Sequence, residues 1–166
     1  MQDKINTIDE INLDEDTLKN KYLTFYTEHQ LFGIPIADVV QIVGVQEITR
    51  VPEFPDYAKG VINLRGTIIP IIDVRLRLKK EEKQYDERTC IIVTSINGSY
   101  IGFIVDSVDE VAKISEANIS NPPKMGSDYV STYITGIAKL ENKIVLLMNL
   151  KKMLNEKEIE LITNLD

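Results

Sequence analysis

The sequence of 166 residues is poor in the residues that carry catalysis and metal binding. It contains one cysteine, one histidine and no tryptophan. A single cysteine cannot form an internal disulfide, and no CxxC, HExxH or EF-hand spacing occurs. The glycine-rich patterns GxGxxG and GxxxxGK, which cradle phosphates, are missing as well. We therefore expect no metal, no cofactor and no catalytic residue, and we predict that the protein is not an enzyme.

Long hydrophobic runs and an excess of positive charge are also absent. No apolar run approaches the roughly 18 residues of a membrane-spanning helix, so we expect no membrane insertion. The net charge of −7 opposes binding to nucleic acid, and the one basic run, RLRLKK at 75–80, is followed at once by acidic residues. The first 18 residues are acidic and lack the basic start and apolar stretch of a secretory signal, which favours the cytoplasm.

The sequence does contain a series of short β-branched segments separated by turn signals. This pattern is typical of a β-barrel or sandwich rather than of alternating strands and helices. The predicted strands are residues 20–27, 31–36, 47–51, 60–64, 67–72, 89–95, 99–105, 108–113, 133–139 and 143–149. Helix is expected at the C-terminus, where Asn155 and Glu158 have the spacing of a capping pair. The apolar face of that helix either packs on a barrel or serves for docking.

The order of these segments contains a repeat. LFGIPIADVVQIV (31–43) aligns with YIGFIVDSVDEVA (100–112) at an offset of 69, and GVINLRGTIIPIIDV (60–74) aligns with GIAKLENKIVLLMNL (136–150) at an offset of 76. The chain is therefore a divergent tandem duplication. Each copy supplies about five strands, which suits a small closed barrel with few exposed edges. We predict a mainly β fold of two small β-barrels packed side by side.

The predicted domain organisation follows this repeat. Its parts are an acidic flexible arm (1–18), a first barrel half (19–78), a charged connector (79–88), a second barrel half (89–149) and a C-terminal helical segment (150–166). The last strands could instead cross over between the barrels, an alternative that the sequence leaves open.

The segment GVINLRGTIIPIIDV carries the most specific features. Arg65-Gly66 reads as a two-residue hairpin loop, in which Gly66 fits a position that requires positive φ. Pro70 cannot donate to a strand ladder, so it belongs on an edge, at a bulge or where its missing N–H faces away from a neighbour. Asp73 and Asp106 both fall at strand ends, where a carboxylate caps the following turn.

Three single residues have no catalytic partner in the sequence. His29 aligns with Gly98 and should lie at a hairpin tip, and Cys90, in TCIIV, reads as a small hydrophobic residue of a strand. The shared fold does not require an arginine at position 65, because the counterpart of Arg65 in the repeat is Glu141. It either makes a contact with a partner protein, for which arginine is well suited, or is a turn residue that is solvated or paired with a nearby carboxylate.

At these segments the sequence resembles the CheW family of chemotaxis coupling proteins, over roughly residues 19–155. The resemblance rests on YLTFYTEHQLFGIPIADVVQIV, ITRVPEFPDYAKGVINLRGTIIPIIDVRLRL, IGFIVDSVDEV and YITGIAKLENKIVLLMNLKKML. Its most specific part is Asn-Leu-Arg-Gly followed by a proline and an aspartate within an apolar run. The resemblance implies a non-enzymatic adaptor that consists of two SH3-like five-stranded β-barrels. A small-ligand-binding β-barrel is the alternative, although barrels of this size are usually filled by their own side chains.

The resemblance also implies partners and contact residues. Members of the family bridge the cytoplasmic tips of methyl-accepting chemotaxis receptors to the histidine kinase CheA, whose regulatory domain has the same fold, in arrays at the membrane. Family members contact the receptor through the cleft between the barrels, which maps onto Val39, Ile42, Gly60, Arg65 and Val111. Gln41 stands where many members have glutamate, which removes any salt bridge from this position to Arg65. The second barrel is expected to pair with the regulatory domain of the kinase.

Overall fold

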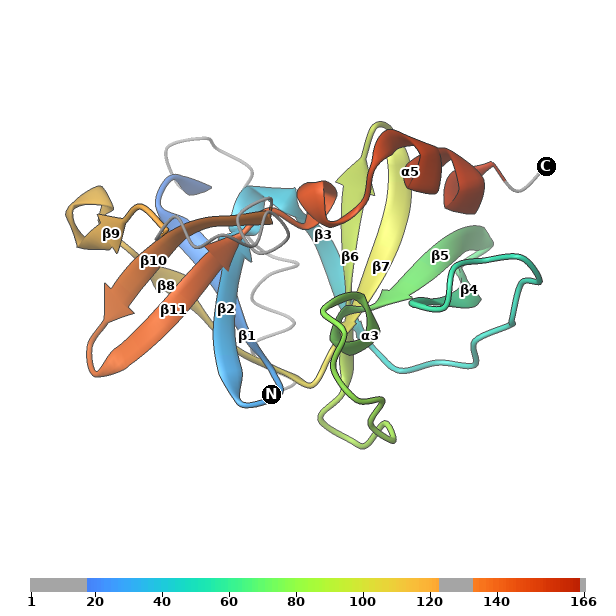
Figure 1. Ribbon diagram of the computed structural model, residues 1–166, viewed down its shortest axis with the longest axis horizontal. Helices are drawn as coiled ribbons and strands as arrows, with labels where there is room; N and C mark the ends of the chain where they lie inside the picture. The colour runs from blue at the N-terminus through green and yellow to red at the C-terminus, as the bar shows by residue number, and fades with distance from the viewer. Residues whose placement is uncertain (1–17, 123–132, 165–166) are drawn as a thin grey trace.

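The computed structural model describes residues 18–122 and 133–164 and confirms the mainly β fold (Figure 1). The strands are β1 (Lys21–Thr27), β2 (Gln30–Pro35), β3 (Val39–Gly44), β4 (Ala58–Leu64), β5 (Thr67–Asp73), β6 (Cys90–Ile96), β7 (Ser99–Val105), β8 (Ser107–Lys113), β9 (Ile119–Ser120), β10 (Ile134–Leu140) and β11 (Lys143–Met148). The short helices are η1 (Ile36–Asp38), α3 (Val74–Arg77), η2 (Glu116–Asn118), η3 (Leu150–Met153) and α5 (Glu156–Thr163). No described helix is long and apolar enough to cross a membrane.

The strands form two sheets, each of which belongs to one SH3-like barrel. Barrel A contains the order β8-β1-β2-β11-β10-β9, and barrel B contains β3-β6-β7-β5-β4. The two barrels therefore do not correspond to the predicted halves 19–78 and 89–149, because each barrel takes strands from both. The physical reason is a pair of parallel contacts between the copies. β2 pairs with β11, and β5 pairs with β7.

The exchange of strands between the copies is reciprocal and follows the repeat. The offset of 69 carries β1, β2 and β3 onto β6, β7 and β8, while the offset of 76 carries β4, β5 and α3 onto β10, β11 and η3. In barrel A, Gly33 faces Leu147 in the parallel ladder, and the equivalent pair in barrel B is Gly102 and Ile71. Both copies therefore make the same contact, each with the other copy.

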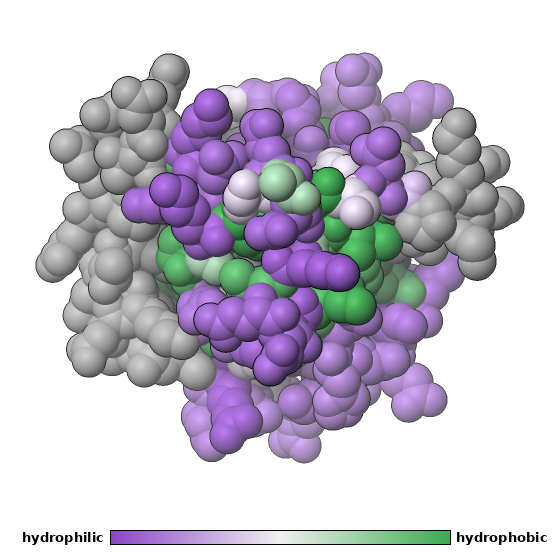
Figure 2. Space-filling model, turned by 90° about the vertical axis from the view of Figure 1, so that its left-hand side faces the viewer, coloured by the Kyte–Doolittle hydropathy of each residue, from purple (hydrophilic) through white to green (hydrophobic). Residues whose placement is uncertain are grey.

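Three apolar clusters stabilise this arrangement. Barrel A is filled by Leu31, Ala112, Ile114, Ala138, Val145 and Leu147, and barrel B by Ile62, Ile69, Ile71, Ile91, Val93 and Ile104. A larger third cluster, which we call the interbarrel core, combines side chains from both sheets, including Phe25 and Phe103. In Figure 2, which views the molecule from the side of barrel A, apolar atoms show between hydrophilic side chains. The barrel interiors are occupied by the protein's own side chains, which argues against the ligand-binding alternative.

The C-terminal helix α5 begins with the predicted capping pair. The Asn155 side chain accepts a hydrogen bond from the Glu158 N–H at 2.8 Å, and the Glu158 side chain accepts one from the Asn155 N–H at 3.0 Å. The buried residues Ile159 and Ile162 belong to the interbarrel core, so the apolar face packs on the protein itself. The predicted arm, residues 1–18, lies outside the described residues apart from Leu18, which packs against the same core.

Two strand predictions differ from the structure. Residues 47–51 form no strand and contribute only a single bridge, between Thr49 and Val61. The structure instead has a strand at β3, and the short β9 was not expected from the sequence either.

Candidate functional site

The hairpin between β4 and β5 has the predicted turn. Arg65 and Gly66 have φ values of 53° and 88°, as a two-residue hairpin with two left-handed positions requires. The Gly66 N–H donates to the side chain of Asn63 at 2.8 Å. The Arg65 side chain is exposed, and within the described part of the chain its guanidinium has no hydrogen bond or ion pair. The turn is therefore architectural, and the charge of Arg65 is available to a partner.

The strand after this turn leads to a buried carboxylate. Asp73 caps α3 as predicted, because its side chain accepts from the Leu76 N–H at 3.4 Å. It also accepts a hydrogen bond from the Tyr85 hydroxyl at 2.7 Å. Burial raises the pKa of Asp73, and burial together with the Asp73 carboxylate raises the pKa of Tyr85. Tyr85 thus anchors residues 79–88, whose charged composition indicates only a connector.

Pro70 fits only the last of its three predicted positions, and Asp106 differs from its predicted local role. Pro70 does not lie on an edge, because β5 is flanked by β4 and β7. It immediately precedes Ile71, where the parallel ladder with β7 begins, so its missing N–H falls outside that ladder. Asp106 does not cap the turn that follows it. Its carboxylate accepts hydrogen bonds from Arg75 and from the backbone N–H of Glu28, both distant in the sequence.

Two of the expected contact residues are buried. Ile42 is only 2% exposed and belongs to the interbarrel core. Gly60 is buried at a bulge of β4 with φ of 141°, and a Cβ atom there would lie 2.1 Å from the Thr49 carbonyl oxygen. Because neither residue presents a side chain to solvent, we assign structural roles to both of them rather than contact with a partner.

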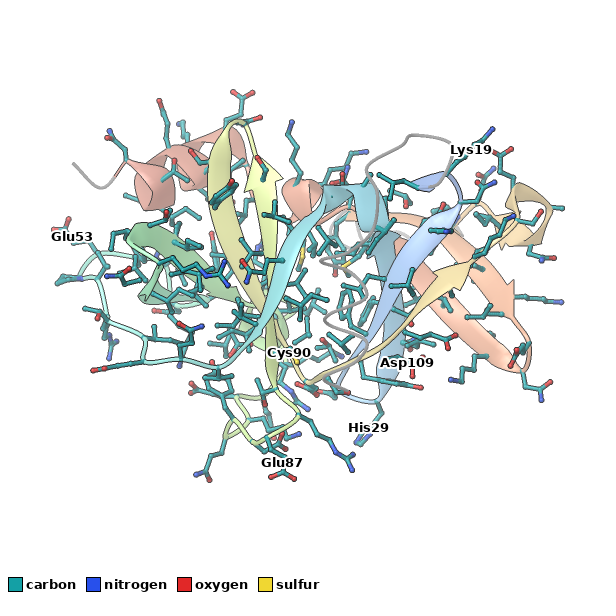
Figure 3. The ribbon with its side chains drawn as sticks, turned by 180° about the vertical axis from the view of Figure 1, so that it is seen from behind. Lys19, His29, Glu53, Glu87, Cys90 and Asp109 are labelled. Carbon is teal, nitrogen blue, oxygen red and sulfur yellow. The ribbon has the colours of Figure 1, made fainter. Side chains whose placement is uncertain are left out.

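Apart from Arg65, the remaining expected contact residues lie on two edge strands. β3 is the edge of barrel B and carries Val39 and Gln41, while β8 is the edge of barrel A and carries Val111. All three are half-buried, and Val39 and Val111 pack against the interbarrel core. Figure 3 shows β3 and β8 on one face of the molecule, one from each barrel. The structure brings these three residues to the seam between the barrels.

The structure adds exposed apolar residues on and directly after β3 that the sequence analysis missed. Val40 on β3 is 43% exposed, and Val45, directly after the strand, is 36% exposed. A signal for them exists in VVQIVGV, where adjacent valines break the alternation of a half-buried strand. We call Val39, Val40, Gln41, Val45 and Val111 the edge-strand surface.

The chain's other reactive residues have structural positions. His29 lies exposed in the turn between β1 and β2, with φ of 66°, as its alignment with Gly98 predicts (Figure 3). Cys90 is buried in β6, and burial raises the pKa of its thiol. No group of three histidine, cysteine or carboxylate side chains among the described residues could hold a metal ion.

Comparison with known proteins agrees with this arrangement. The family model of the CheW-like domain matches residues 21–158. The chemotaxis protein CheW of Klebsiella aerogenes is 33% identical over 149 residues, which cover 90% of each chain. That of Bacillus subtilis is 31% identical over 137 residues, covering 82% of this chain and 88% of the relative.

A solved structure shares the fold as well. The scaffolding protein TtCheW from Thermoanaerobacter tengcongensis matches with a TM-score of 0.76 and 36% identity, over 84% of this chain and 96% of that one. The duplicated barrels, the Arg65 hairpin and these matches lead to one conclusion: the chain belongs to the CheW family and is a chemotaxis adaptor.

Proposed function

We propose that this adaptor couples the cytoplasmic tip of a methyl-accepting chemotaxis receptor to the regulatory domain of the histidine kinase CheA. The observation that carries the proposal is the Arg65 hairpin. An exposed guanidinium without a bond to another described residue is held on a two-residue turn, and the equivalent turn of the second copy carries Glu141 instead. Because the architecture is the same in both turns, the arginine serves contact rather than folding.

We place the receptor contact on the edge-strand surface. Exposed valines there supply apolar area, and their position between two barrels offers a partner contacts with both. Ile42 fixes β3 from the interbarrel core, whereas Gly60 lies on β4 against the backbone of Thr49. Recruitment of the protein to receptor arrays in the cytoplasm follows from this contact.

Arg65→Ala tests the proposal, with Glu141→Ala as a matched control. Both residues have positive φ, 53° and 55°, so either substitution leaves the backbone strain of its turn unchanged. We expect Arg65→Ala to unfold at the wild-type urea concentration and to weaken binding to a receptor tip or to the CheA regulatory domain about tenfold, the typical effect of losing one interfacial arginine. Glu141→Ala should bind like the wild type. Unchanged affinity of Arg65→Ala for both partners would contradict the proposal.

Val40→Glu tests the location of the receptor contact. A charge on this exposed position of β3 should weaken titration with the receptor tip at least tenfold, because the carboxylate would have to be desolvated in the interface. Ile144→Glu, at a position of β11 that is 59% exposed, is the control and should leave receptor affinity unchanged. Equal effects of the two variants would remove the edge-strand surface from the proposal.

A further inference from the structure

The chain passes directly from barrel B to barrel A at one residue. β7 ends at Val105 and β8 begins at Ser107, so Asp106 is the entire connection. Its backbone N–H donates to the Tyr26 carbonyl of β1 at 3.0 Å. The position of Asp106 therefore sets where β8 of barrel A leaves β7 of barrel B.

The carboxylate of Asp106 joins residues from both barrels. Arg75, in the helix that follows β5 of barrel B, donates from Nε at 2.8 Å and from Nη2 at 2.7 Å, a bidentate pair. The backbone N–H of Glu28, in the turn between β1 and β2 of barrel A, donates to the same carboxylate at 2.8 Å. The Glu28 side chain in turn lies 3.8 Å from Nη1 of Arg75. We call Glu28, Arg75 and Asp106 the clasp.

The side chains of Arg75 and Asp106 are largely shielded from solvent, which strengthens their ion pair. The side chains of Arg75 and Asp106 are only 15% and 16% exposed. Burial by itself raises the pKa of Asp106, but the hydrogen bonds from Arg75 and Glu28 outweigh it and hold the pKa below 3.8. Bidentate arginine–carboxylate pairs fix geometry as well as charge. The carboxylate is thus ionised and oriented at neutral pH.

The repeat has an equivalent crossing between the barrels, and this second crossing lacks a clasp. The equivalents of Glu28, Arg75 and Asp106 are Asn97, Lys151 and Ala37, so the central carboxylate is missing. This second crossing, through η1 between β2 and β3, has a cavity of about 120 Å³ lined by Ile34, Asp38, Thr94, Ser95, Ile96, Asn149, Leu150 and Lys151. Among the described residues no ion pair within 4.0 Å joins Asp38 to Lys151. A cavity also borders the clasp, with a volume of about 630 Å³ and a lining that includes Arg75 and Asp106. The two crossings therefore differ in the ion pair that spans them: the clasp fastens one, and the other has no equivalent.

We propose that the clasp of Glu28, Arg75 and Asp106 fixes the relative orientation of the two barrels. The inference does not depend on which partners the adaptor binds. Each barrel has its own apolar interior, so loss of the clasp changes the angle between barrels while both remain folded. The interbarrel core is the remaining joint about which they move.

Distances between spin labels on the two barrels test this inference. Labels at Lys139→Cys in barrel A and Thr67→Cys in barrel B, both exposed positions, would be introduced in a Cys90→Ala background. We expect one narrow distance distribution for the intact clasp and a distribution at least about twofold wider for Arg75→Ala. Lys151→Ala, the equivalent position in the repeat, is the matched control and should keep the narrow distribution.

Two outcomes would overturn the inference. One is an unchanged width for Arg75→Ala, and the other is equal broadening for Lys151→Ala. Should Arg75→Ala fail to fold, Asp106→Asn replaces it, since asparagine still accepts from the Glu28 N–H but lacks the charge that holds Arg75. An unchanged distribution for Asp106→Asn would overturn the inference equally. Hydrogen exchange of β1 and β6 amides should stay at wild-type protection in either folded variant.

Discussion

Replacing Gly60 by alanine should destabilise the protein by about 4 kcal/mol, although the change adds a single methyl group. The φ of 141° is a conformation that residues with a Cβ rarely adopt, and the strain costs about 2 kcal/mol. The new Cβ would also lie 2.1 Å from the Thr49 carbonyl oxygen, so the backbone there must move away. That movement breaks the two hydrogen bonds of 2.8 Å between Thr49 and Val61, at about 1 kcal/mol each.

Substitutions at two other glycines separate the cost of backbone strain from the cost of the steric clash. Gly66 has φ of 88° but open space around its Cβ position, so Gly66→Ala should cost only about 1 kcal/mol of strain. Gly136 is the repeat equivalent of Gly60, yet the atom nearest its Cβ position is the side-chain Cγ2 of Ile119 at 2.8 Å, and the nearest backbone atom, the Ser120 carbonyl oxygen, is 3.4 Å away. Gly136→Ala should therefore cost about 1–2 kcal/mol.

Urea unfolding with linear extrapolation measures all three free energies of unfolding. A Gly60→Ala protein no less stable than Gly66→Ala would refute the steric reasoning, because both would then reflect φ alone. The Gly60→Ala variant also tests whether Gly60 has a structural role or contacts the receptor. Because neither Gly60 nor Thr49 belongs to the edge-strand surface, receptor binding by the folded fraction of Gly60→Ala should equal that of the wild type.

Three further predictions follow from buried groups. The pKa of Asp73 is raised by burial, so its contribution to stability is full below pH 3.8 and is lost as the pH rises through the raised pKa. Asp73→Asn, which keeps the cap of α3, should gain stability relative to the wild type in urea unfolding as the pH rises above 3.8, and a constant difference would contradict this. Gly102→Ala should cost about 1–3 kcal/mol, more than Gly33→Ala, because its Cβ would approach two isoleucines at 2.7 Å, against 3.0 Å to the nearest atom at Gly33; equal melting temperatures for the two variants would show that the barrel interior adapts freely. The buried Cys90 thiol should react with a disulfide reagent only as fast as the protein unfolds, and rapid labelling of the native protein would place it at the surface instead.

The local structure follows from the sequence where short-range chemistry decides it. The Arg65-Gly66 turn, the cap at Asp73 and the pair Asn155–Glu158 all depend on residues within three positions of one another, and all three form as predicted. The segment 47–51 was wrong as a strand because the Gly60 bulge lies opposite it, which leaves room for one bridge. That bulge lies in the partner strand β4, so the sequence of 47–51 does not reveal it.

The pairing of strands between the copies could not be predicted. The alternation of β2 and β7 satisfies pairing within one copy as well as pairing across copies, and only the packed barrels choose between them. Which of the expected contact residues are buried could not be predicted either. The family resemblance implies that Ile42 and Gly60 are contact residues. In the structure the Ile42 side chain lies in the interbarrel core, and the Cβ position of Gly60 faces the backbone of Thr49. Arg75 and Asp106, 31 positions apart, carry no local signal of their bond.

The reciprocal exchange of strands imposes an order on synthesis of the chain. Barrel B needs no strand beyond β7, so it is complete once the ribosome has made Val105. Barrel A must wait for β11, which ends at Met148, even though its strands β1 and β2 are the first to emerge. Until then, β2 has an unpaired edge beside a finished neighbour. Proteolysis within 79–88 would for the same reason leave two fragments that each hold parts of both barrels and remain paired with each other, and neither fragment would be a domain.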